Sequence, residues 1–458
     1  MKKRDRTVFE CSECGHTEAK WLGKCPACGV WNSFMEVPAG LGSGSPGSAH
    51  AGTLSDAHGR RGAAHSPVTL SEIDVDAVPQ GPTGIRELDR VLGGGITPGG
   101  SVLLGGPPGI GKSTLMLQLA ARTGKPTLYV TAEEPLHQVG RRARRLGASS
   151  QDVDILSTTQ LEEVLDAVAR KAPEILIIDS IQTLYTREAG TVPGLAAQVR
   201  SCSFALLEWG REHGTGVFLI AHVTKEGSIA GPKLLEHMVD TVLYFEETEG
   251  TLRVVRAAKN RFGPTDEVAL FRMAEKGLTE VADPGGAFMT TRSSVPPGVA
   301  VAPVFEGSRV FLVEVQALTV SAKSGVSRTY SDRVDSGRVS RVAAVLEKHL
   351  GLSFSDQDLY VNIAGGLKVR EVGIELPLAM ALYSARTGVP LPTGTAIIGE
   401  VSLAGEVRPV GHTRGRAKAA RDLGYETLIA PPAGYGEEDG GVNWYTVETV
   451  DAAVQRLF

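Results

Sequence analysis

A glycine-rich loop between an apolar strand and a helix is the feature that most constrains this chain. Residues 101–105 form an apolar run typical of a buried strand, and residues 115–122 have helical character. The segment between them matches the pattern G-x4-G-K-[ST], whose glycines let backbone N–H groups surround a phosphate at a helix N-terminus. Its residues are Gly106, Pro107, Pro108, Gly109, Ile110, Gly111, Lys112, Ser113 and Thr114. The sequence therefore predicts a P-loop site for a nucleoside triphosphate.

Side chains at the end of the P-loop and of a later strand indicate binding of ATP and Mg²⁺. We expect Lys112 to reach the β- and γ-phosphates and Ser113 to offer its hydroxyl to Mg²⁺. An apolar strand over residues 174–178 ends in Asp179, a Walker B pattern in which the carboxylate helps to hold the metal ion. This pattern is a weak signal alone, but it becomes a strong one when it follows a P-loop.

Two other expected strands also precede residues suited to ATP hydrolysis. The strand at residues 126–131 is followed by Glu133, which can polarise an attacking water, although an ordinary acidic helix start gives the same pattern. The strand at residues 216–221 is followed by His222, which either senses the γ-phosphate or makes a structural hydrogen bond. Because strands alternate with helices, we expect a mostly parallel sheet with these side chains gathered at its C-terminal edge.

Four of the five cysteines lie close together near the start of the sequence, in the pattern C-x2-C-x10-C-x2-C. They are Cys11, Cys14, Cys25 and Cys28. Two such pairs complete a tetrahedral shell of four sulfurs for a structural Zn²⁺, with no open position for catalysis. Disulfides are the alternative, but they do not fit a cytosolic protein. The sequence therefore predicts a zinc ribbon, while Cys202 is expected in the core.

The ribbon also carries a possible docking surface. Trp21 and Trp31 could stack on bases, with Lys20 and Lys24 near phosphates, or these side chains could be the ribbon's own packing. We expect packing for at least one of the two tryptophans.

Composition and length suggest several cytosolic domains. The chain has 458 residues, of which 42% are hydrophobic, and its net charge of −5 excludes a histone-like polycation. We find no apolar run long enough for a membrane span and no signal peptide, so a cytoplasmic location is expected. The predicted divisions are a ribbon over 1–37, a flexible linker over 38–67, an ATPase domain over 68–285 and a second α/β domain over 290–458.

Two basic segments allow more than one interpretation. The motif Lys259, Asn260, Arg261, Phe262 and Gly263 follows a β-rich stretch and suggests a phosphate contact or a finger that acts on a neighbouring subunit, but an exposed basic turn would look the same. The arginines of residues 141–145 lie in an expected helix, where they are either a solvated face or a DNA contact.

Taken in order, these motifs resemble the bacterial RadA (Sms) family. The residues that carry the resemblance are the four-cysteine ribbon, the P-loop, Ala132-Glu133-Glu134, Asp179-Ser180-Ile181-Gln182-Thr183, His222-Val223-Thr224-Lys225-Glu226-Gly227 and Lys259-Asn260-Arg261-Phe262-Gly263. The resemblance implies a RecA-like ATPase core followed by a domain similar to that of Lon protease. It also implies a DNA-dependent ATPase of recombinational repair that branch-migrates intermediates as a ring helicase. The expected partners are single-stranded and branched DNA, a RecA-type recombinase and a homo-hexamer.

The same resemblance suggests roles for individual residues. Glu133 matches the catalytic glutamate and His222 the γ-phosphate sensor, while Lys259 and Arg261 belong to a motif that couples ATP to DNA across a subunit interface. The segment 223–233 matches a DNA-binding loop. Its Lys225 and Lys233 are candidate strand contacts, with ordinary loop lysines as the alternative.

The C-terminal third resembles the Lon proteolytic domain without its serine–lysine dyad. The stretch Glu371-Val372-Gly373-Ile374 holds no serine, and the lysine position falls on Arg414, which stays protonated. This stretch also departs from the Glu-Pro-Ala-Ala-Asp expected of the RadA family. The basic residues of the domain form either a DNA-facing surface or solvated helix faces. They are Arg328, Arg333, Arg338, Arg341, Lys368, Arg370, Arg408, Arg414, Arg416, Lys418 and Arg421.

Two rival functions remain open at this stage. A regulatory switch would bind ATP without working on DNA, and it could dispense with Glu133. An ATP-dependent protease of the Lon class is disfavoured by the missing dyad.

The four-cysteine assignment predicts the behaviour of one substitution. Cys28→Ser should remove the zinc and the coupling to DNA or to a partner, because a sulfur ligand is lost, while basal ATP hydrolysis is spared. Metal analysis of the purified protein measures the zinc content, with Cys202→Ser as the control that keeps it. An unchanged zinc content in Cys28→Ser would contradict the assignment.

Overall fold

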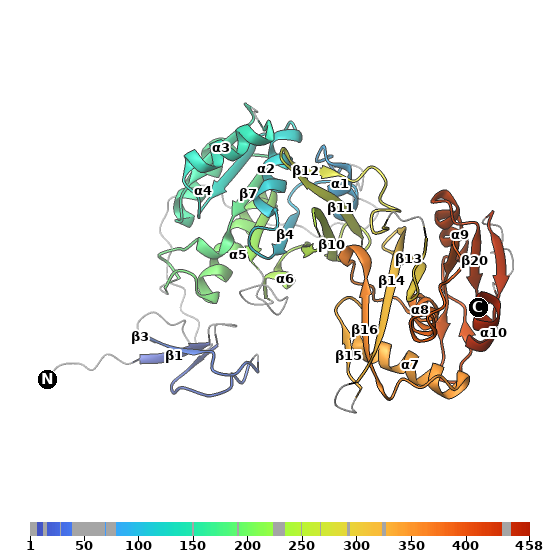
Figure 1. Cartoon of the computed structure of the whole chain (residues 1–458). Helices are drawn as coiled ribbons and strands as arrows, with labels where there is room; N and C mark the ends of the chain where they lie inside the picture. Colours follow the sequence, from blue (N-terminus) through green and yellow to red (C-terminus); the bar gives the residue numbers. More distant parts are fainter. Residues whose placement is uncertain are drawn as a thin grey trace. The chain divides into compact units, whose positions relative to one another are not determined.

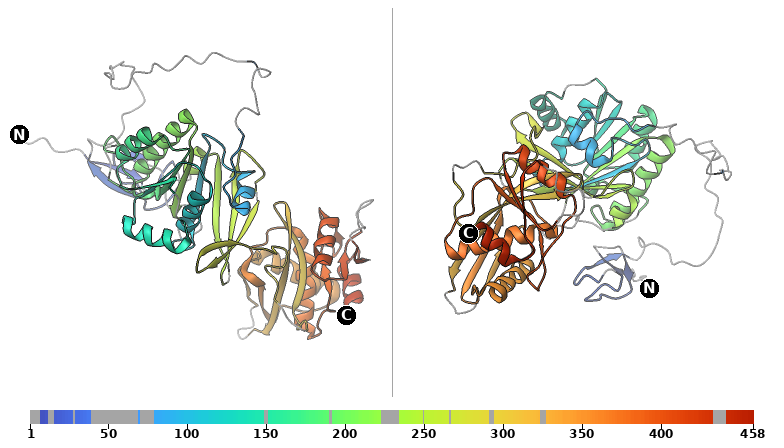
Figure 2. Two further views of the ribbon diagram at one scale, coloured as in Figure 1. Left: turned by 90° about the horizontal axis from the view of Figure 1, so that it is seen from above. Right: turned by 90° about the vertical axis from the view of Figure 1, so that its right-hand side faces the viewer.

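The computed structural model divides into two compact units, which we describe separately. It describes residues 7–11, 16–27, 29–38, 69, 79–148, 151–189, 192–222, 234–248, 250–265, 267–290, 294–322, 327–432 and 441–458. The first unit holds residues 1–244 and 258–263, and the second holds residues 245–257 and 264–458. Figure 1 labels the helices and strands, and Figure 2 gives two further views.

The N-terminal ribbon is a small antiparallel sheet built around sulfur atoms. Its strands are β1 (Thr7–Cys11), β2 (Thr17–Glu18) and β3 (Phe34–Pro38), in the order β2-β1-β3. The buried cluster contains Cys11, Cys25 and Phe34, with Phe9 packed against it. One phenylalanine and two small cysteine side chains make a small core, which is why we expect such a module to depend on its metal to fold.

A nine-stranded sheet follows, in the order β12-β11-β10-β9-β4-β8-β7-β5-β6. Its strands are β4 (Ser101–Gly106), β5 (Thr127–Thr131), β6 (Val153–Ser157), β7 (Ile175–Asp179), β8 (Gly216–His222), β9 (Thr241–Glu247), β10 (Leu252–Asn260), β11 (Val268–Ala274) and β12 (Gly277–Glu280). The pairs that join β9, β4, β8, β7, β5 and β6 are parallel, whereas β10, β11 and β12 pair in antiparallel fashion. The mostly parallel α/β fold expected from the sequence is confirmed.

Helices pack on the parallel sheet, and the residues of β4, β5, β7 and β8 are buried almost throughout, whereas the edge strand β6 is partly exposed. These helices are α1 (Arg86–Leu92), α2 (Lys112–Arg122), α3 (Leu136–Leu146), α4 (Leu161–Lys171), the short η2 (Ile181–Thr183), α5 (Ala196–His213) and α6 (Leu234–Met238). One apolar cluster joins α4 and α5 to alternate residues of the strands, such as Leu103, Leu176 and Leu219. Strands buried on both faces carry their polar residues at their ends, and this places the functional groups at one edge.

The second unit contains a seven-stranded mixed sheet, in the order β15-β16-β14-β13-β17-β20-β21. Its strands are β13 (Val299–Glu306), β14 (Arg309–Ser321), β15 (Thr329–Ser331), β16 (Gln357–Ile363), β17 (Thr395–Ile397), β20 (Thr427–Ala430) and β21 (Asn443–Thr446), with β18 (Glu400–Val401) and β19 (Val407–Arg408) as a separate pair. Its helices are α7 (Ser336–Leu350), η3 (Ala364–Gly366), η4 (Val372–Ile374), α8 (Glu375–Thr387), α9 (Thr413–Asp422) and α10 (Val450–Leu457).

Alternating residues of the strands assign the helices of this unit to opposite faces of its sheet. Ile397 and Ile429 join the core that contains α7, α8 and α10, whereas their neighbours Ala396 and Leu428 pack with Ala417 of α9. Successive side chains of a strand point to opposite faces, so α9 covers one face and the other helices cover the second.

A buried arginine links β9, β10 and β13 within the second unit. The guanidinium of Arg256 donates to Glu246 (Nε–Oε1 2.9 Å) and to Glu306 (Nη1–Oε2 2.6 Å). Apolar residues of β10 and of its neighbour β11, Leu252 and Val268 among them, belong to the core of this unit. The ion pairs therefore hold β10, and the apolar contacts hold both β10 and β11, to the rest of the second unit.

Among the described residues, no helix has the length and apolar character needed to cross a membrane. The domain limits taken from the sequence, 1–37, 38–67, 68–285 and 290–458, stay predictions.

The buried ion pairs predict a large effect for Arg256→Met. Glu306 is only 8% exposed, and burial already raises its pKa, so the loss of its cation leaves an uncompensated buried charge. Breaking such a pair costs about 3–5 kcal/mol. At roughly 2–4 °C per kcal/mol in a domain of this size, the melting temperature should fall by about 10 °C. Differential scanning calorimetry measures it, with Arg272→Met on the exposed part of β11 as the control. Equal melting temperatures for the two variants would contradict the prediction.

Candidate functional site

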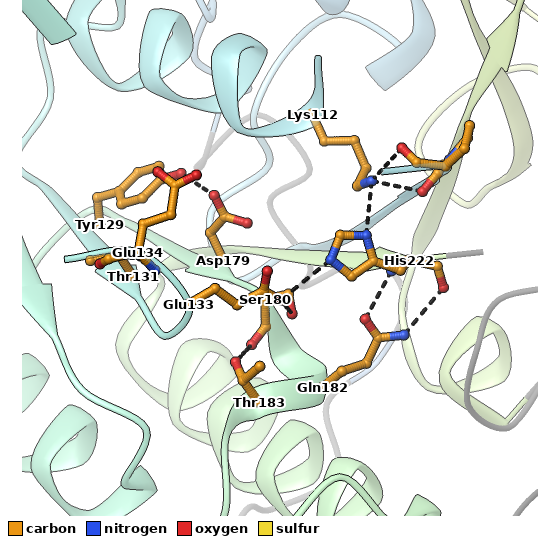
Figure 3. A network of polar contacts seen from close by, with 12 residues as sticks. Lys112, Tyr129, Thr131, Glu133, Glu134, Asp179, Ser180, Gln182, Thr183 and His222 are labelled. Atoms are coloured by element: carbon orange, nitrogen blue, oxygen red, sulfur yellow. Dashed lines mark hydrogen bonds and ion pairs between the residues drawn. The ribbon is translucent and has the colours of Figure 1, made fainter. Parts of the chain in front are cut away.

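The register of four parallel strands brings the predicted site residues to one edge of the sheet. Gly106 lies opposite His222, and Asp179 lies opposite Thr131, which is two residues before Glu133. Figure 3 shows Lys112, Glu133, Asp179 and His222 converging at this edge. The expected gathering of these side chains is what the structure shows.

The P-loop links β4 to α2 with two glycines in the left-handed region. Gly109 has φ of 77° and Gly111 has φ of 122°, conformations that L side chains rarely adopt. Helix α2 begins at Lys112 directly after Gly111, so the helix N-terminus opens onto the loop. This strand–loop–helix geometry suits a phosphate group.

The ammonium group of Lys112 lies inside the P-loop. Its Nζ donates to Gly106 O (2.7 Å) and Pro107 O (3.0 Å), and it lies 3.3 Å from His222 Nδ1. Burial lowers the pKa of Lys112 to about 8, although the carboxylates of Asp179 and Glu133 act in the opposite direction. A nearby anion would restore the charged form, because opposite charges favour ionisation.

His222 connects Lys112 to Glu133. Its Nδ1 faces the Lys112 ammonium, and its Nε2 lies 3.3 Å from Glu133 Oε1. An ammonium group can only donate, so the tautomer that satisfies both contacts accepts at Nδ1 and donates from Nε2. The backbone of His222 is held in turn by Gln182, which accepts from its N–H (2.9 Å) and donates to its carbonyl (3.2 Å). The histidine therefore has a fixed position at the end of β8.

Glu133 lies at the exposed rim of this edge. Its carboxylate accepts hydrogen bonds from Ser180 Oγ and from His222, and the side chain remains 39% exposed. A carboxylate that is held by two donors but open to solvent can orient and polarise a water molecule.

Asp179 lies deeper than Glu133 and contacts two hydroxyl groups. Tyr129 donates to its Oδ2 at 2.5 Å, and Ser113 also donates to the carboxylate. Burial raises the pKa of Asp179, while these two hydrogen bonds favour the ionised form. Hydroxyl and carboxylate oxygens are the ligands that Mg²⁺ prefers, so Ser113 and Asp179 are a suitable donor pair for this ion.

Three residues that organise this site were not among the predicted site residues. Tyr129 lies inside an apolar strand, Ser180 follows the Walker B aspartate, and Gln182 lies in the η2 turn. Ser180 and Gln182 belong to the motif 179–183 that carries the family resemblance, whereas nothing in the sequence pointed to Tyr129. Their contacts depend on the order of β8, β7 and β5 in the sheet, which no single stretch of sequence specifies.

The motif Lys259–Gly263 is engaged mainly with its own chain. Lys259 Nζ donates to the carbonyls of Glu236 (2.8 Å) and Val239 (2.6 Å) around the end of α6, and Asn260 Nδ2 donates to Val91 O. Arg261 pairs with the buried Asp240 at 3.2 Å yet remains more than half exposed. A contact from this motif to DNA or to another subunit stays a prediction, with Arg261 the more accessible cation.

Phe262 and Gly263 complete this motif against the end of α1. A Cβ added at Gly263 would lie 2.6 Å from Gly93 Cα, so the close approach requires glycine. Phe262 is partly exposed beside it.

Several predicted site residues lie outside the described residues. They are Lys225 and Lys233 of the expected DNA-binding loop and the zinc-ligand candidates Cys14 and Cys28. Within the described part of the chain no cluster of three or more metal-ligating side chains occurs.

The described half of the ribbon fits a metal site. Cys11 and Cys25 are both buried, and Cys25 closes a tight turn in which its carbonyl accepts from Gly29 N–H at 2.9 Å. Each is one member of a C-x2-C pair, so the donor set matches a four-sulfur zinc shell. Trp21 and Trp31 are 51% and 68% exposed, and the rings flank Gly23. Both rings are thus largely exposed yet lie against the ribbon's own backbone, and Lys24 lies over the Trp31 ring, 5.7 Å from its centroid. A stacking contact of either tryptophan with bases stays a prediction.

In the C-terminal domain, the stretch expected to hold a protease serine instead holds an ion pair. Arg416 binds Glu371 through both guanidinium Nη atoms at 2.7 Å, and it also donates to Pro303 O (2.7 Å) and Gly411 O (2.8 Å). Arg414, at the expected lysine position, is exposed.

This pairing corrects part of the predicted basic surface. Arg416 is only 3% exposed and cannot face DNA, and Arg338 is engaged with Glu375 and with the carbonyls of Arg370 and Glu371. In the first unit, Arg142 of α3 likewise pairs with Glu134 at 2.6 Å. Arg414, Lys418 and Arg421 are exposed, and their DNA contact stays a prediction.

Three family models match parts of the chain. Residues 9–36 match a rubredoxin metal binding domain, residues 66–228 match an AAA domain, and residues 332–434 match the subunit ChlI of Mg-chelatase. The three matches follow the order of the ribbon, the P-loop domain and the C-terminal domain.

Curated relatives match the whole chain. The DNA repair protein RadA of Treponema pallidum (strain Nichols) is 47% identical over 100% of this chain and 98% of its own length. The DNA repair protein RadA of Pseudomonas aeruginosa is 41% identical over 100% of both chains. A crystal structure of the RadB recombinase, 26% identical, covers 43% of this chain and 98% of its own, with a TM-score of 0.37. The chain therefore belongs to the RadA family of DNA repair proteins, with a RecA-like ATPase core between an N-terminal zinc ribbon and a C-terminal ChlI-type domain.

Proposed function

We propose that this chain is a DNA-dependent ATPase of recombinational repair that branch-migrates recombination intermediates. It works on single-stranded and branched DNA as a hexameric ring helicase, together with a RecA-type recombinase. The observation that carries the proposal is the chain of contacts from Lys112 through His222 to Glu133, with Asp179 at the same sheet edge. A protein that only binds nucleotide has no need of the carboxylate that Glu133 supplies.

ATP binds through the P-loop in this proposal. The backbone N–H groups of residues 109–114 surround the β-phosphate, since Pro107 and Pro108 have none, and the Lys112 ammonium leaves the loop carbonyls for the β- and γ-phosphates. Ser113 and Asp179 hold Mg²⁺, which neutralises charge on the phosphates.

Hydrolysis depends on Glu133 as the general base. Its carboxylate takes a proton from the attacking water, and Ser180 and His222 keep it oriented. His222 contacts both Lys112 and Glu133, so a γ-phosphate that displaces Lys112 also displaces His222. Because β8 ends at His222, this displacement is transmitted to the strand and to the segment that follows it.

The remaining parts of the chain bind the partners. Lys225 and Lys233 contact the DNA strand, and Arg261 reaches across the subunit interface, since it is the exposed cation of the motif Lys259–Gly263. The ribbon holds Zn²⁺ through Cys11, Cys14, Cys25 and Cys28. We expect no peptidase activity from the C-terminal domain, because the stretch 371–374 holds no serine and Arg414 stands at the expected lysine position.

Steady-state ATP hydrolysis with and without single-stranded DNA tests this function. Wild type should be strongly stimulated by DNA, and Glu133→Gln should lose at least about 100-fold in rate because the amide cannot accept the proton. Binding of a fluorescent ATP analogue should remain in this variant. Hydrolysis that is indifferent to DNA would favour a nucleotide switch, and full activity in Glu133→Gln would remove Glu133 from the mechanism.

The low pKa of Lys112 predicts proton uptake when nucleotide binds. The free site titrates near pH 8, and phosphate charge raises the pKa of the ammonium, so MgATP binding at pH 8 should take up about half a proton from Lys112. Uptake should grow towards pH 9 and disappear near pH 6.5, and affinity should weaken as the pH rises through 8. Titration calorimetry in buffers of different ionisation enthalpy measures the number of protons that are taken up on binding. The same uptake at pH 6.5 and pH 8.5 would contradict this account.

A further inference from the structure

One fully buried tyrosine directs its only polar atom at the site. Tyr129 has 0% of its side chain exposed and lies in β5, where every residue is buried. Its hydroxyl nevertheless donates to Asp179 Oδ2 at 2.5 Å. Among the largest fully buried side chains of the described residues, Tyr129 is the one tyrosine. The other residues of β5 are apolar, except for a threonine at each end of the strand. Packing alone would be served equally well by phenylalanine.

The strand register explains how the contact forms. Tyr129 lies opposite Ile177 of β7, and Asp179 is two residues further along that strand, on the same face. Neighbouring strands lie about 4.8 Å apart and each residue adds about 3.3 Å along a strand, so these diagonal neighbours lie about 8 Å apart, a span that an aromatic side chain can bridge. The ring therefore runs along the sheet surface from a rigid interior position to the C-terminal edge.

Several groups around Asp179 act on its carboxylate, so its orientation needs a fixed support. Ser113 donates to the same carboxylate, and Lys112, Glu133 and Glu134 contribute charges nearby. Arg142 forms its ion pair with Glu134 (Nη2–Oε1 2.6 Å) and not with Asp179. Tyr129 is thus the contact that comes from the interior of the sheet and not from the loops that bind nucleotide.

We propose that Tyr129 is a positioning residue that fixes the Asp179 carboxylate for Mg²⁺ bound with nucleotide. This inference rests on the proposed function, in which Asp179 and Ser113 hold the ion. Hydrogen bonds to a ligating carboxylate fix its orientation, and losing one typically costs about 10–100-fold in metal affinity. Tyr129 itself does not touch the metal, so its removal should weaken metal-dependent binding and leave metal-free nucleotide binding intact.

The test uses the full-length zinc-loaded protein and a fluorescent ADP analogue, without any turnover. For wild type, Tyr129→Phe and Tyr244→Phe, the analogue is titrated in EDTA and then at increasing Mg²⁺. Tyr244 is the matched control because its hydroxyl also binds a carboxylate, Glu236 at 3.0 Å, and not Asp179. Phenylalanine fills the same volume at both positions, and thermal melting verifies the fold.

The expected result is specific to the metal. In Tyr129→Phe, the Mg²⁺ concentration that gives half of the Mg²⁺-dependent gain in affinity for the analogue should rise about tenfold. The affinity for the analogue in EDTA should be unchanged, and Tyr244→Phe should match wild type. An unchanged Mg²⁺ dependence in Tyr129→Phe would overturn the proposal. So would an equal loss of affinity with and without Mg²⁺, because that pattern describes general loosening. If wild type shows no Mg²⁺-dependent nucleotide binding, the proposed function itself fails.

Discussion

The backbone hydrogen bonding between parallel strands is the constraint on which the rest of this site depends. The ladders β4–β8 and β5–β7 set Gly106 opposite His222 and Thr131 opposite Asp179. Strands with these registers must end at a common edge, and so their polar terminal residues meet although they are far apart in the sequence. A shift of one residue in either ladder would turn the terminal side chains to the other face of the sheet and disperse the site.

Once the side chains meet, a partly buried environment makes their contacts depend on one another. Lys112, His222 and Glu133 form one chain of polar contacts, and Asp179 adds hydroxyl groups from the P-loop and from the sheet interior. A polar group that is removed from water costs more free energy when its hydrogen-bond partner is missing, so each of these side chains is kept in place by the others. This explains why a site that must exchange ligands can still be well ordered, since its supports come from buried strands.

The fold class could be predicted from the sequence, and so could the meeting of Lys112, Glu133, Asp179 and His222 at one sheet edge, because both follow from local patterns. The P-loop and the apolar strands that end in Asp179 and His222 could be recognised within short windows, and the helix after the P-loop follows a helical period. Contacts between strands were not accessible in this way. Tyr129 reads as an ordinary apolar strand residue until β5 is placed beside β7.

The same limit explains the errors. Arg416 looked like one more cation of a basic helix, but burial against Glu371 depends on tertiary packing. Arg338 was likewise grouped with the exposed cations, but it binds Glu375 and two backbone carbonyls. The packing of β10 and β11 into the core of the second unit is another long-range contact that no short stretch of sequence reveals.

The Arg416–Glu371 pair also has a consequence for how this domain responds to substitution. A buried arginine that binds one carboxylate and two backbone carbonyls tolerates no simple single replacement, because removing either charge leaves the other without its partner at a cost of about 3–5 kcal/mol. The pair fastens the residue that precedes η4 to α9 and to β13. Exchanging both charged residues together for apolar ones is therefore the change that the fold tolerates best.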